Sequence, residues 1–484
     1  MRRQFLLVVG FLAICSYCSY LALAQQNAAP AASNQQMEAP PASGQQAEAP
    51  AASGQQTEAP AASNAQCIDC HSKSKPQIVS EWKQSKHSQV NVGCIDCHGA
   101  GHASASDVAK VKIARPEICA RCHQTQVDQD RRGKHALALA AMRTMPNAHW
   151  RPARSLQPEP VGSGQAVCAD CHRIGSSGAK EEVTFERFGG IEGGALGRGA
   201  GACGSCHSRH TFSVEEARQP QACQYCHSGP DHDQWGMYAS SRHGIQFDLK
   251  QRRLLPADAA VPTCQTCHMP NGDHEVRTSW GYRGIIRPLP SDKEWAADRT
   301  EIMKAMNILG SNGEENPLAV TMKAAEVMRF TQEDWQRDRD KMVKVCVQCH
   351  SENYVKQQLQ AGDDMVRLAD HFLAEAIRVV SGLYKDGLLP PPQPERNYPW
   401  LTRFDPPPTL IEQMLETMYL EHRTSAFQGK FHGSLNYALA DGRGKLRQDL
   451  DAITDLAKEL RRSHAATGTH HPVKTASPAK PKAK

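Results

Sequence analysis

The sequence predicts a mainly α-helical, loop-rich fold with a regular C-terminal part, and three observations predict it. From about residue 293 onward, apolar residues recur every three or four positions, which is the period of an amphipathic helix. Residues 66–352 instead carry repeated Cys- and His-containing motifs between loop-like segments. Aromatic residues make up only 6% of the 484 residues, so side chains alone supply little material for a large core.

The motif Cys-x-x-Cys-His occurs eight times and uses 16 of the 18 cysteines, Cys15 and Cys18 being the other two. In this motif two thiols bind a porphyrin covalently and the histidine is an axial ligand of its iron. A single Cys-x-x-Cys also occurs in zinc sites and thiol redox centres, but eight copies that all end in His indicate eight covalently bound c-type haems. The attachment cysteines are Cys67, Cys70, Cys94, Cys97, Cys119, Cys122, Cys168, Cys171, Cys203, Cys206, Cys223, Cys226, Cys264, Cys267, Cys346 and Cys349, and the proximal histidines are His71, His98, His123, His172, His207, His227, His268 and His350.

Eight haems would change both the core and the charge of the protein. If each macrocycle buries about 400 Å² of apolar surface, it contributes on the order of 10 kcal/mol to folding, so we expect the haems to form the core. The formal net charge is +5, but roughly sixteen propionates would be added, ionised at neutral pH unless buried or paired. The loaded protein is therefore expected to be acidic, and its charge does not indicate nucleic-acid binding.

The N-terminal segment predicts export. Residues 1–24 have a basic start, an apolar stretch and small residues at the end, the layout of a secretory signal peptide. An uncleaved anchor is the alternative, because the apolar stretch approaches the ~20 residues that span a bilayer. Residues 25–65 repeat Glu-Ala-Pro amid Ser, Gly and Gln and predict a low-complexity linker. Either way the body is expected in the periplasm or an equivalent compartment, and an anchor would tether it to the membrane.

The rest of the chain divides into three parts. Residues 66–352 are predicted as an octahaem c-type cytochrome domain, residues 353–462 as a C-terminal helical region and residues 463–484 as a disordered tail. Such helices pack on a haem domain or on sister subunits. The expected amphipathic runs are 317–344, 363–385, 409–426 and 443–462.

The number of histidines permits either an electron wire or an enzyme. Apart from the motifs and the tail, eleven histidines remain. A wire with two histidines on every iron would use eight of them. An enzyme would leave one iron open to its substrate.

Short segments beside the motifs form a more specific pattern, and on them the chain resembles a known family from about Cys67 to Asn436. This family is the octahaem hydroxylamine oxidoreductases, which include hydrazine dehydrogenases and nitrite-reducing relatives. The segments are Trp82–His87 (WKQSKH), His135–Leu137 (HAL), Arg209–Ser213 (RHTFS), Cys226–Trp235 (CHSGPDHDQW), Ser241–Gly244 (SRHG) and Cys267–Met269 (CHM).

The resemblance implies one open haem, on the sixth motif (Cys223–His227), with Asp231 and His232 over its distal face. Oxidation of a small nitrogen compound releases protons, and a histidine beside a carboxylate suits a proton acceptor near neutral pH. We therefore expect His232 to accept the proton and Asp231 to be its partner, the alternative being that His232 is an eighth distal ligand. The seven implied distal ligands are His87, His102, His135, His210, His243, His274 and His432.

Tyr437 is the residue on which the predicted direction of the reaction depends. In the family, oxidising members carry a C-terminal tyrosine from a neighbouring subunit that is bonded to the catalytic porphyrin, whereas relatives without this bond tend to reduce nitrite. Tyr437, which follows His432 by five residues, is the candidate, although the family's Trp and Pro-Gly features are missing around it.

The first hypothesis is an exported octahaem oxidoreductase that oxidises hydroxylamine or hydrazine at one haem, which the tyrosine cross-link would modify. One alternative is a nitrite or hydroxylamine reductase without the cross-link. The other is a non-catalytic electron-transfer subunit of a membrane respiratory complex. The expected redox partner is a c-type cytochrome or a quinone-linked membrane protein, and the resemblance implies a homotrimer.

Overall fold

The computed structural model describes residues 63–112, 114–138, 202–229, 232–277, 287–324, 331–392, 396–402 and 407–467. These residues belong to one compact unit, Pro60–Lys484. The signal and linker segments, the whole fourth haem motif (Cys168–His172) and Asp231 lie outside the described residues.

The part of the chain that carries the haem motifs consists of short helices joined by loops. Local sequence explains how the first ones begin: Ser63 and Gln66 form a capping box, and Pro76 occupies the first turn of the next helix. The elements are α2 (Asn64–Ser74), α3 (Pro76–Gln84), α4 (Lys86–Gln89), α5 (Cys94–His98), η1 (Ala105–Lys110), α6 (Pro116–Arg132), η2 (His135–Leu137), η5 (Ala202–Ser205), α10 (Val214–Ala217), α11 (Gln221–Gln224), α12 (Gln234–Ala239), α13 (Arg242–Gln251), α14 (Cys264–His268) and η6 (Pro270–Gly272).

Two motif helices are capped by the residue that lies between the two cysteines. In α5, Asp96 Oδ2 accepts the backbone N–H of Gly93 at 2.7 Å. In α14, Thr266 Oγ1 accepts the backbone N–H of Thr263 at 3.0 Å. Because these bonds fix the first helical turn, both thiols and the histidine, at positions i, i+3 and i+4, are presented on one side of the helix.

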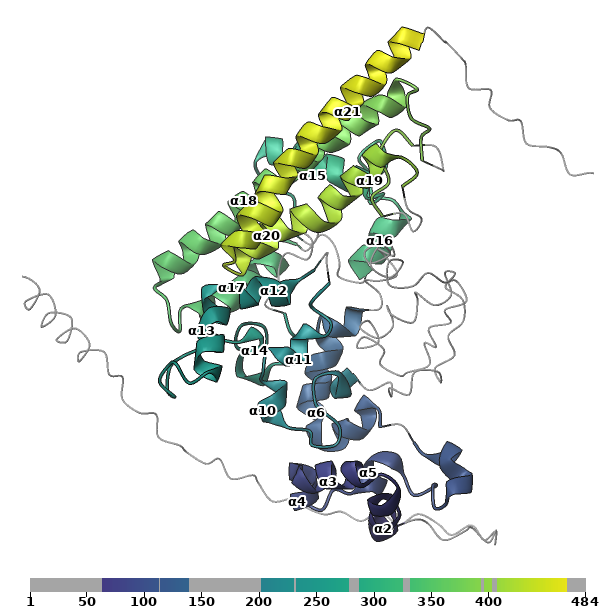
Figure 1. Ribbon diagram of the computed structural model, residues 1–484, viewed down its shortest axis with the longest axis vertical. Coiled ribbons are helices and arrows are strands. Elements are labelled where there is room, and N and C mark those ends of the chain that lie inside the picture. Colours follow the sequence, from purple (N-terminus) through teal and green to yellow (C-terminus); the bar gives the residue numbers. More distant parts are fainter. Residues whose placement is uncertain are drawn as a thin grey trace, which may run out of the picture. The chain divides into compact units, whose positions relative to one another are not determined.

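The C-terminal part is built from longer helices that share one apolar core (Figure 1). Helix α18 is the longest described helix, with 34 residues, and it packs against α15, α20 and α21. Leu373 and Ile377 of α18 and Ile453 of α21 are completely buried there. The elements are α15 (Lys293–Ala305), α16 (Pro317–Ala324), α17 (Gln332–Cys346), α18 (Glu352–Lys385), α19 (Leu410–Thr417), η8 (Met418–His422), α20 (Arg423–Phe431), η9 (Asn436–Gly444) and α21 (Lys445–Thr467).

A buried ion cluster holds three of these helices together. Asp370 of α18 accepts hydrogen bonds from Arg423 of α20, at 3.0 and 2.6 Å, and from Arg299 of α15 at 3.3 Å. The indole N–H of Trp295 donates to the same carboxylate at 2.8 Å. Buried charges are tolerated only when they are paired and hydrogen-bonded, so the cluster specifies how α15, α18 and α20 pack.

Helix α20 and the π-helix η9 approach each other closely through glycines. A Cβ atom on Gly442 would lie 2.3 Å from Cα of Ala426, and one on Gly429 would lie 2.7 Å from Cβ of Tyr437. The close approach fixes the turn between the two elements. His432 and Tyr437 are thereby both held against the haem-motif part of the chain.

The mainly α-helical prediction is confirmed, because the described residues contain helices and two isolated bridges but no named strand. The predicted start of the disordered tail differs from the structure. Helix α21 continues to Thr467, a few residues past residue 463. None of the described helices is long and apolar enough to cross a membrane.

Replacing Gly442 with alanine tests the α20–η9 contact. The added methyl group would meet backbone rather than a flexible side chain, so we expect a loss of about 1–3 kcal/mol in unfolding free energy, measured by denaturant titration of the haem-loaded protein. Gly382→Ala is the matched control, because its Cβ would meet only the tip of Arg461 at 3.0 Å. Equal stability of the two variants would contradict the close packing.

Candidate functional site

Every described haem motif presents its histidine to a second histidine from elsewhere in the chain. The ring centroids are 6.0–6.4 Å apart in all these pairs. The pairs, with the motif histidine first, are His71 with His102, His98 with His210, His123 with His87, His207 with His274, His227 with His135, His268 with His432 and His350 with His243.

This spacing fits two imidazoles on opposite sides of one iron. A metal–nitrogen bond to imidazole is roughly 2 Å long, and the ring centroid lies roughly 1 Å beyond the nitrogen, so trans ligands have centroids roughly 6 Å apart. Rings in ordinary van der Waals contact have no reason to repeat this distance at separate places. The described residues therefore fit the group that the motifs imply.

Hydrogen bonds also orient several of these rings for iron. Nδ1–H of His98 donates to the carbonyl of Lys112 at 2.9 Å, and Nδ1–H of His432 donates to the carbonyl of Gln428 at 2.8 Å. Nδ1–H of His227 donates to the amide oxygen of Gln234 at 3.1 Å. A proton on Nδ1 leaves Nε2 of a neutral ring with its lone pair for a metal.

Burial keeps the most enclosed rings neutral. It lowers the pKa of His227 to about 4 and that of His268 to about 3. It also lowers the pKa of His135 and of His432. Since only neutral imidazole binds a metal, these rings are in the ligating form at physiological pH.

The motifs follow one another as a chain of near neighbours. The buried thiol of Cys94 has a raised pKa, to which the neighbouring thiol of Cys67 contributes. A hydrogen bond from Cys203 lowers the pKa of Cys119, and one to Cys264 raises the pKa of Cys223. Thiols from different motifs are thus close, which places successive haems side by side for electron transfer.

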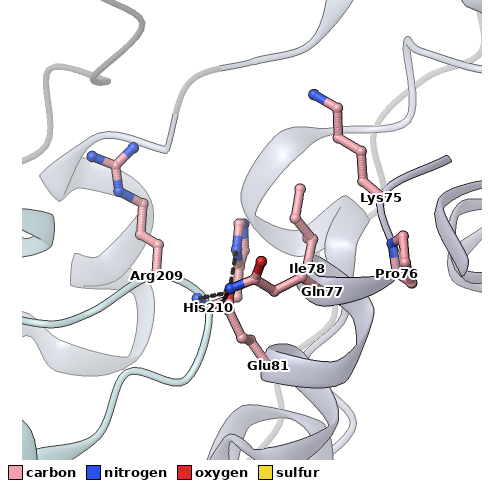
Figure 2. A pocket seen from close by; sticks show the side chains of 7 residues that line it. All are labelled: Lys75, Pro76, Gln77, Ile78, Glu81, Arg209 and His210. Atoms are coloured by element: carbon pink, nitrogen blue, oxygen red, sulfur yellow. Dashed lines mark hydrogen bonds and ion pairs between the residues drawn. The ribbon is translucent and has the colours of Figure 1, made fainter.

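A cavity of about 610 Å³ lies beside the distal histidine of the second motif, His210 (Figure 2). Glu81 lines it and accepts the backbone N–H of His210 at 3.3 Å. Lys75 and Arg209 also line it. A cavity of this size with two cations suits a macrocycle whose propionates need positive partners.

Near the sixth motif, whose haem the family resemblance implies to be open, two rings lie at similar distances from His227: His135 at 6.3 Å and His232 at 6.4 Å. Nε2–H of His232 donates to the carbonyl of Cys226 at 2.9 Å, and this bond ties His232 to the motif's own backbone. His135, which lies 92 residues before His227 in sequence, has the same centroid spacing as the second ring of the other pairs. The open sixth haem stays a prediction, and His135 is the alternative second ligand that the structure offers.

The remaining predicted site residues are only partly brought together. Asp231 lies outside the described residues. The hydroxyl of Tyr437 donates to Asp233 of its own chain at 2.5 Å, at the start of α12. Burial, followed by this carboxylate, raises the pKa of Tyr437. Tyr437 is thus engaged beside the sixth motif.

Two histidines outside the haem pairs contact carboxylates instead. Nδ1 of His371 is 3.1 Å from Asp298, and Nδ1 of His422 is 2.5 Å from Asp449. Both lie in the C-terminal helical part, in agreement with a structural role. Sequence reasoning missed the residues that orient the rings, such as Gln234 and Asp107. The capping pattern Ser-x-x-Asp that ends at Asp107 was the available signal for the latter.

Comparison with known proteins agrees with these centres. A family model described as seven times multi-haem cytochrome CxxCH matches residues 196–302 and 319–397, and one described as cytochrome c554 and c-prime matches residues 15–99 and 118–208. A probable nitrite reductase-hydroxylamine oxidoreductase fusion protein of Kuenenia stuttgartiensis is 25% identical over 367 residues, covering 69% of this chain and 39% of that protein. The chain thus spans about two fifths of that relative's length.

This chain is a multihaem c-type cytochrome, and it is similar to proteins of the hydroxylamine oxidoreductase family. Two solved structures show the same fold. A reducing hydroxylamine oxidoreductase-like protein complex of Kuenenia stuttgartiensis has a TM-score of 0.59 at 21% identity, covering 84% of this chain and 86% of that chain. A hypothetical multiheme protein has a TM-score of 0.58 at 20% identity, covering 83% of the cytochrome and 96% of that chain.

His135→Ala tests which iron of the cytochrome is open. If His135 is trans to His227, its loss converts one six-coordinate low-spin iron to high spin, which electron paramagnetic resonance detects as an added high-spin signal. His371→Ala is the control and should leave the spin states unchanged, because that ring contacts Asp298. An unchanged spectrum in His135→Ala would support the prediction of an open sixth haem.

Proposed function

We propose that this cytochrome is an exported octahaem reductase of nitrite or hydroxylamine, with one open haem on the fourth motif. The seven proximal histidines among the described residues each face a second histidine, and we assign the open iron to the remaining motif, that of His172, which lies outside the described residues. His87, His102, His135, His210, His243, His274 and His432 would be the distal ligands. An open iron supplies a position where the nitrogen atom of the substrate can bind and receive electrons.

The observation that carries the direction is the position of Tyr437. Its hydroxyl is hydrogen-bonded to Asp233 of the same chain, and its Cβ packs on Gly429. This engagement within its own chain supports a Tyr437 that is not bonded to the porphyrin of a neighbouring subunit. The name of the similar Kuenenia complex, a reducing hydroxylamine oxidoreductase-like protein, supports the same direction.

His232 is the residue that we assign to proton transfer. A carbonyl only accepts, so the bond to Cys226 places the ring proton on Nε2, and Nδ1 is the basic nitrogen of the neutral ring. Reduction of a nitrogen oxide consumes protons together with electrons, and an imidazole that is not an iron ligand can deliver them. Asp231, the preceding residue, would be its carboxylate partner. Electrons would come from a c-type cytochrome or a quinone-linked partner, and the assembly would be a homotrimer.

Haem-peptide mass spectrometry tests the direction. We expect the proteolytic peptides that carry Cys168–His172 and Cys223–His227 to have the mass of unmodified haem, and Tyr437→Phe to leave the ferrous absorption spectrum unchanged. The same variant should lose about 0.5–1.5 kcal/mol of stability with its hydrogen bond. A haem peptide that carries the mass of the tyrosine peptide would favour oxidation of hydroxylamine or hydrazine instead.

His232→Ala tests the proton donor. We expect turnover of nitrite or hydroxylamine to fall by about 10²–10⁴-fold, the usual contribution of general acid–base catalysis, with haem content and spin states unchanged. Turnover is measured with a reduced dye as electron donor, and haem content is measured by the pyridine haemochrome assay. An added high-spin signal would mean that His232 is a ligand. If all eight irons of the unaltered protein are six-coordinate and no substrate binds, the protein is a non-catalytic electron-transfer subunit instead.

A further inference from the structure

The hydrogen-bond partners of the axial histidines differ in charge from haem to haem. His98 and His432 donate to backbone carbonyls, and His227 donates to an amide. These acceptors are neutral. On the first haem, Nδ1–H of His102 donates to a carboxylate, Asp107 Oδ1, at 2.9 Å.

Asp107 is held in place by the backbone as well as by His102. Its Oδ1 accepts the N–H of Ala103 at 3.1 Å and that of Ser104 at 2.9 Å, as the cap of helix η1. The side chains of His102 and Asp107 are only 22% and 20% exposed. On the opposite ligand, Nδ1 of His71 is buried and has no hydrogen-bond partner within the part of the chain that the structure describes. An influence of hydrogen bonding on the first iron therefore acts through His102.

We propose that Asp107 makes the first haem the low-potential end of the electron path. A carboxylate that accepts the Nδ1 proton of an axial histidine gives the ring partial imidazolate character and makes it a stronger donor to iron. A stronger donor stabilises ferric over ferrous iron, so the reduction potential falls. The low potential rests on ligation of this iron by His71 and His102 alone, whereas its use for electron entry rests on the proposed direction of the reaction.

The second haem provides an internal comparison. Glu81 Oε2 lies 3.9 Å from Nδ1 of His210, which is too far for a hydrogen bond. Its bond is to the backbone N–H of the same residue, at 3.3 Å. Glu81 therefore lies near the second haem but accepts no hydrogen bond from Nδ1 of His210. We expect the reduction potential of the second haem to lie above that of the first.

The position of the first motif gives this ordering a consequence. Asn64 of α2, the helix of the first motif, accepts the backbone N–H of Ile95 in the second motif at 3.0 Å, and α5 of the second motif packs against α6, which carries the third. The first haem therefore leads into the row of neighbouring haems. Electrons move spontaneously from low to high potential. An external donor that reduces the first haem would therefore supply electrons that pass on to the neighbouring haems. We assign the first haem as the point of electron entry.

Asp107→Asn tests the assignment in the haem-loaded protein, because it removes the charge and keeps the size. The readout is a potentiometric titration followed by electron paramagnetic resonance, in which His102→Ala first identifies the low-spin signal of this haem. We expect the ferrous-to-ferric ratio of that signal at a fixed potential to rise about tenfold, equal to ~59 mV for one electron. The other signals should stay in place.

Asp69→Asn is the matched control. Asp69 lies on the first motif helix and pairs with Lys73 at 3.0 Å, so it offers the same loss of charge at a carboxylate that is engaged by a lysine instead of an axial ring. An equal shift in both variants, or no shift in Asp107→Asn, would overturn the proposal. If Asp107→Asn loses haem, Asp107→Ser keeps an oxygen for the cap and gives the same test. Nitrite reduction by the control variant shows separately whether the proposed function stands.

Discussion

The fold of the haem-bearing part depends on pairs of histidines held on opposite sides of one iron. Few apolar side chains are completely buried in its described residues, Val127 and Met237 being the clearest cases. Each pair joins a motif to a segment that is often distant in sequence, as His98 is joined to His210. A porphyrin between two such rings supplies the apolar surface that the side chains lack, and its iron supplies the covalent geometry. Without it, most loops in this part would have little to fold against.

The C-terminal helices differ from the haem-bearing part because they have an apolar core of their own. Some of their residues also reach the haem motifs. The ion cluster around Asp370 fixes α20, and Gly442 allows η9 to lie against it. Gln428 on α20 accepts two hydrogen bonds near the haem motifs, one on its backbone carbonyl and one on its side-chain oxygen. Its carbonyl accepts from His432, and its side-chain oxygen accepts from Gln234, which in turn orients His227. One helix therefore orients the ligands of two haems, and its packing and the haem chemistry are coupled.

Sequence reasoning is strong for local chemistry and weak for pairing. The motifs predict haems because the two thiols and the histidine lie within five consecutive residues. The helical period after residue 293 likewise predicts amphipathic helices. The identity of the histidine trans to each iron is different, since it is decided by loops whose paths no short pattern records. The family resemblance implied Asp231 and His232 over the distal face of the sixth haem, whereas the structure also brings the ring of His135 to 6.3 Å from His227. Histidines that lie close together in space can thus be far apart in sequence, and a short motif does not record this.

The same distinction separates the supply of electrons from the supply of protons. In the proposed reductase, electrons pass between irons that keep both ligands, so that little rearranges when an electron passes, and the repeated histidine pairs suit this role. Proton delivery would use a ring that is not a ligand, and we assign it to His232, whose Nε2–H donates to the carbonyl of Cys226. The carboxylates divide in the same way: Asp107 accepts from the proposed ligand His102, whereas Asp233 accepts from the phenol of Tyr437. In this proposal the engagement of the phenol by Asp233 goes with an unmodified porphyrin, and therefore with reduction.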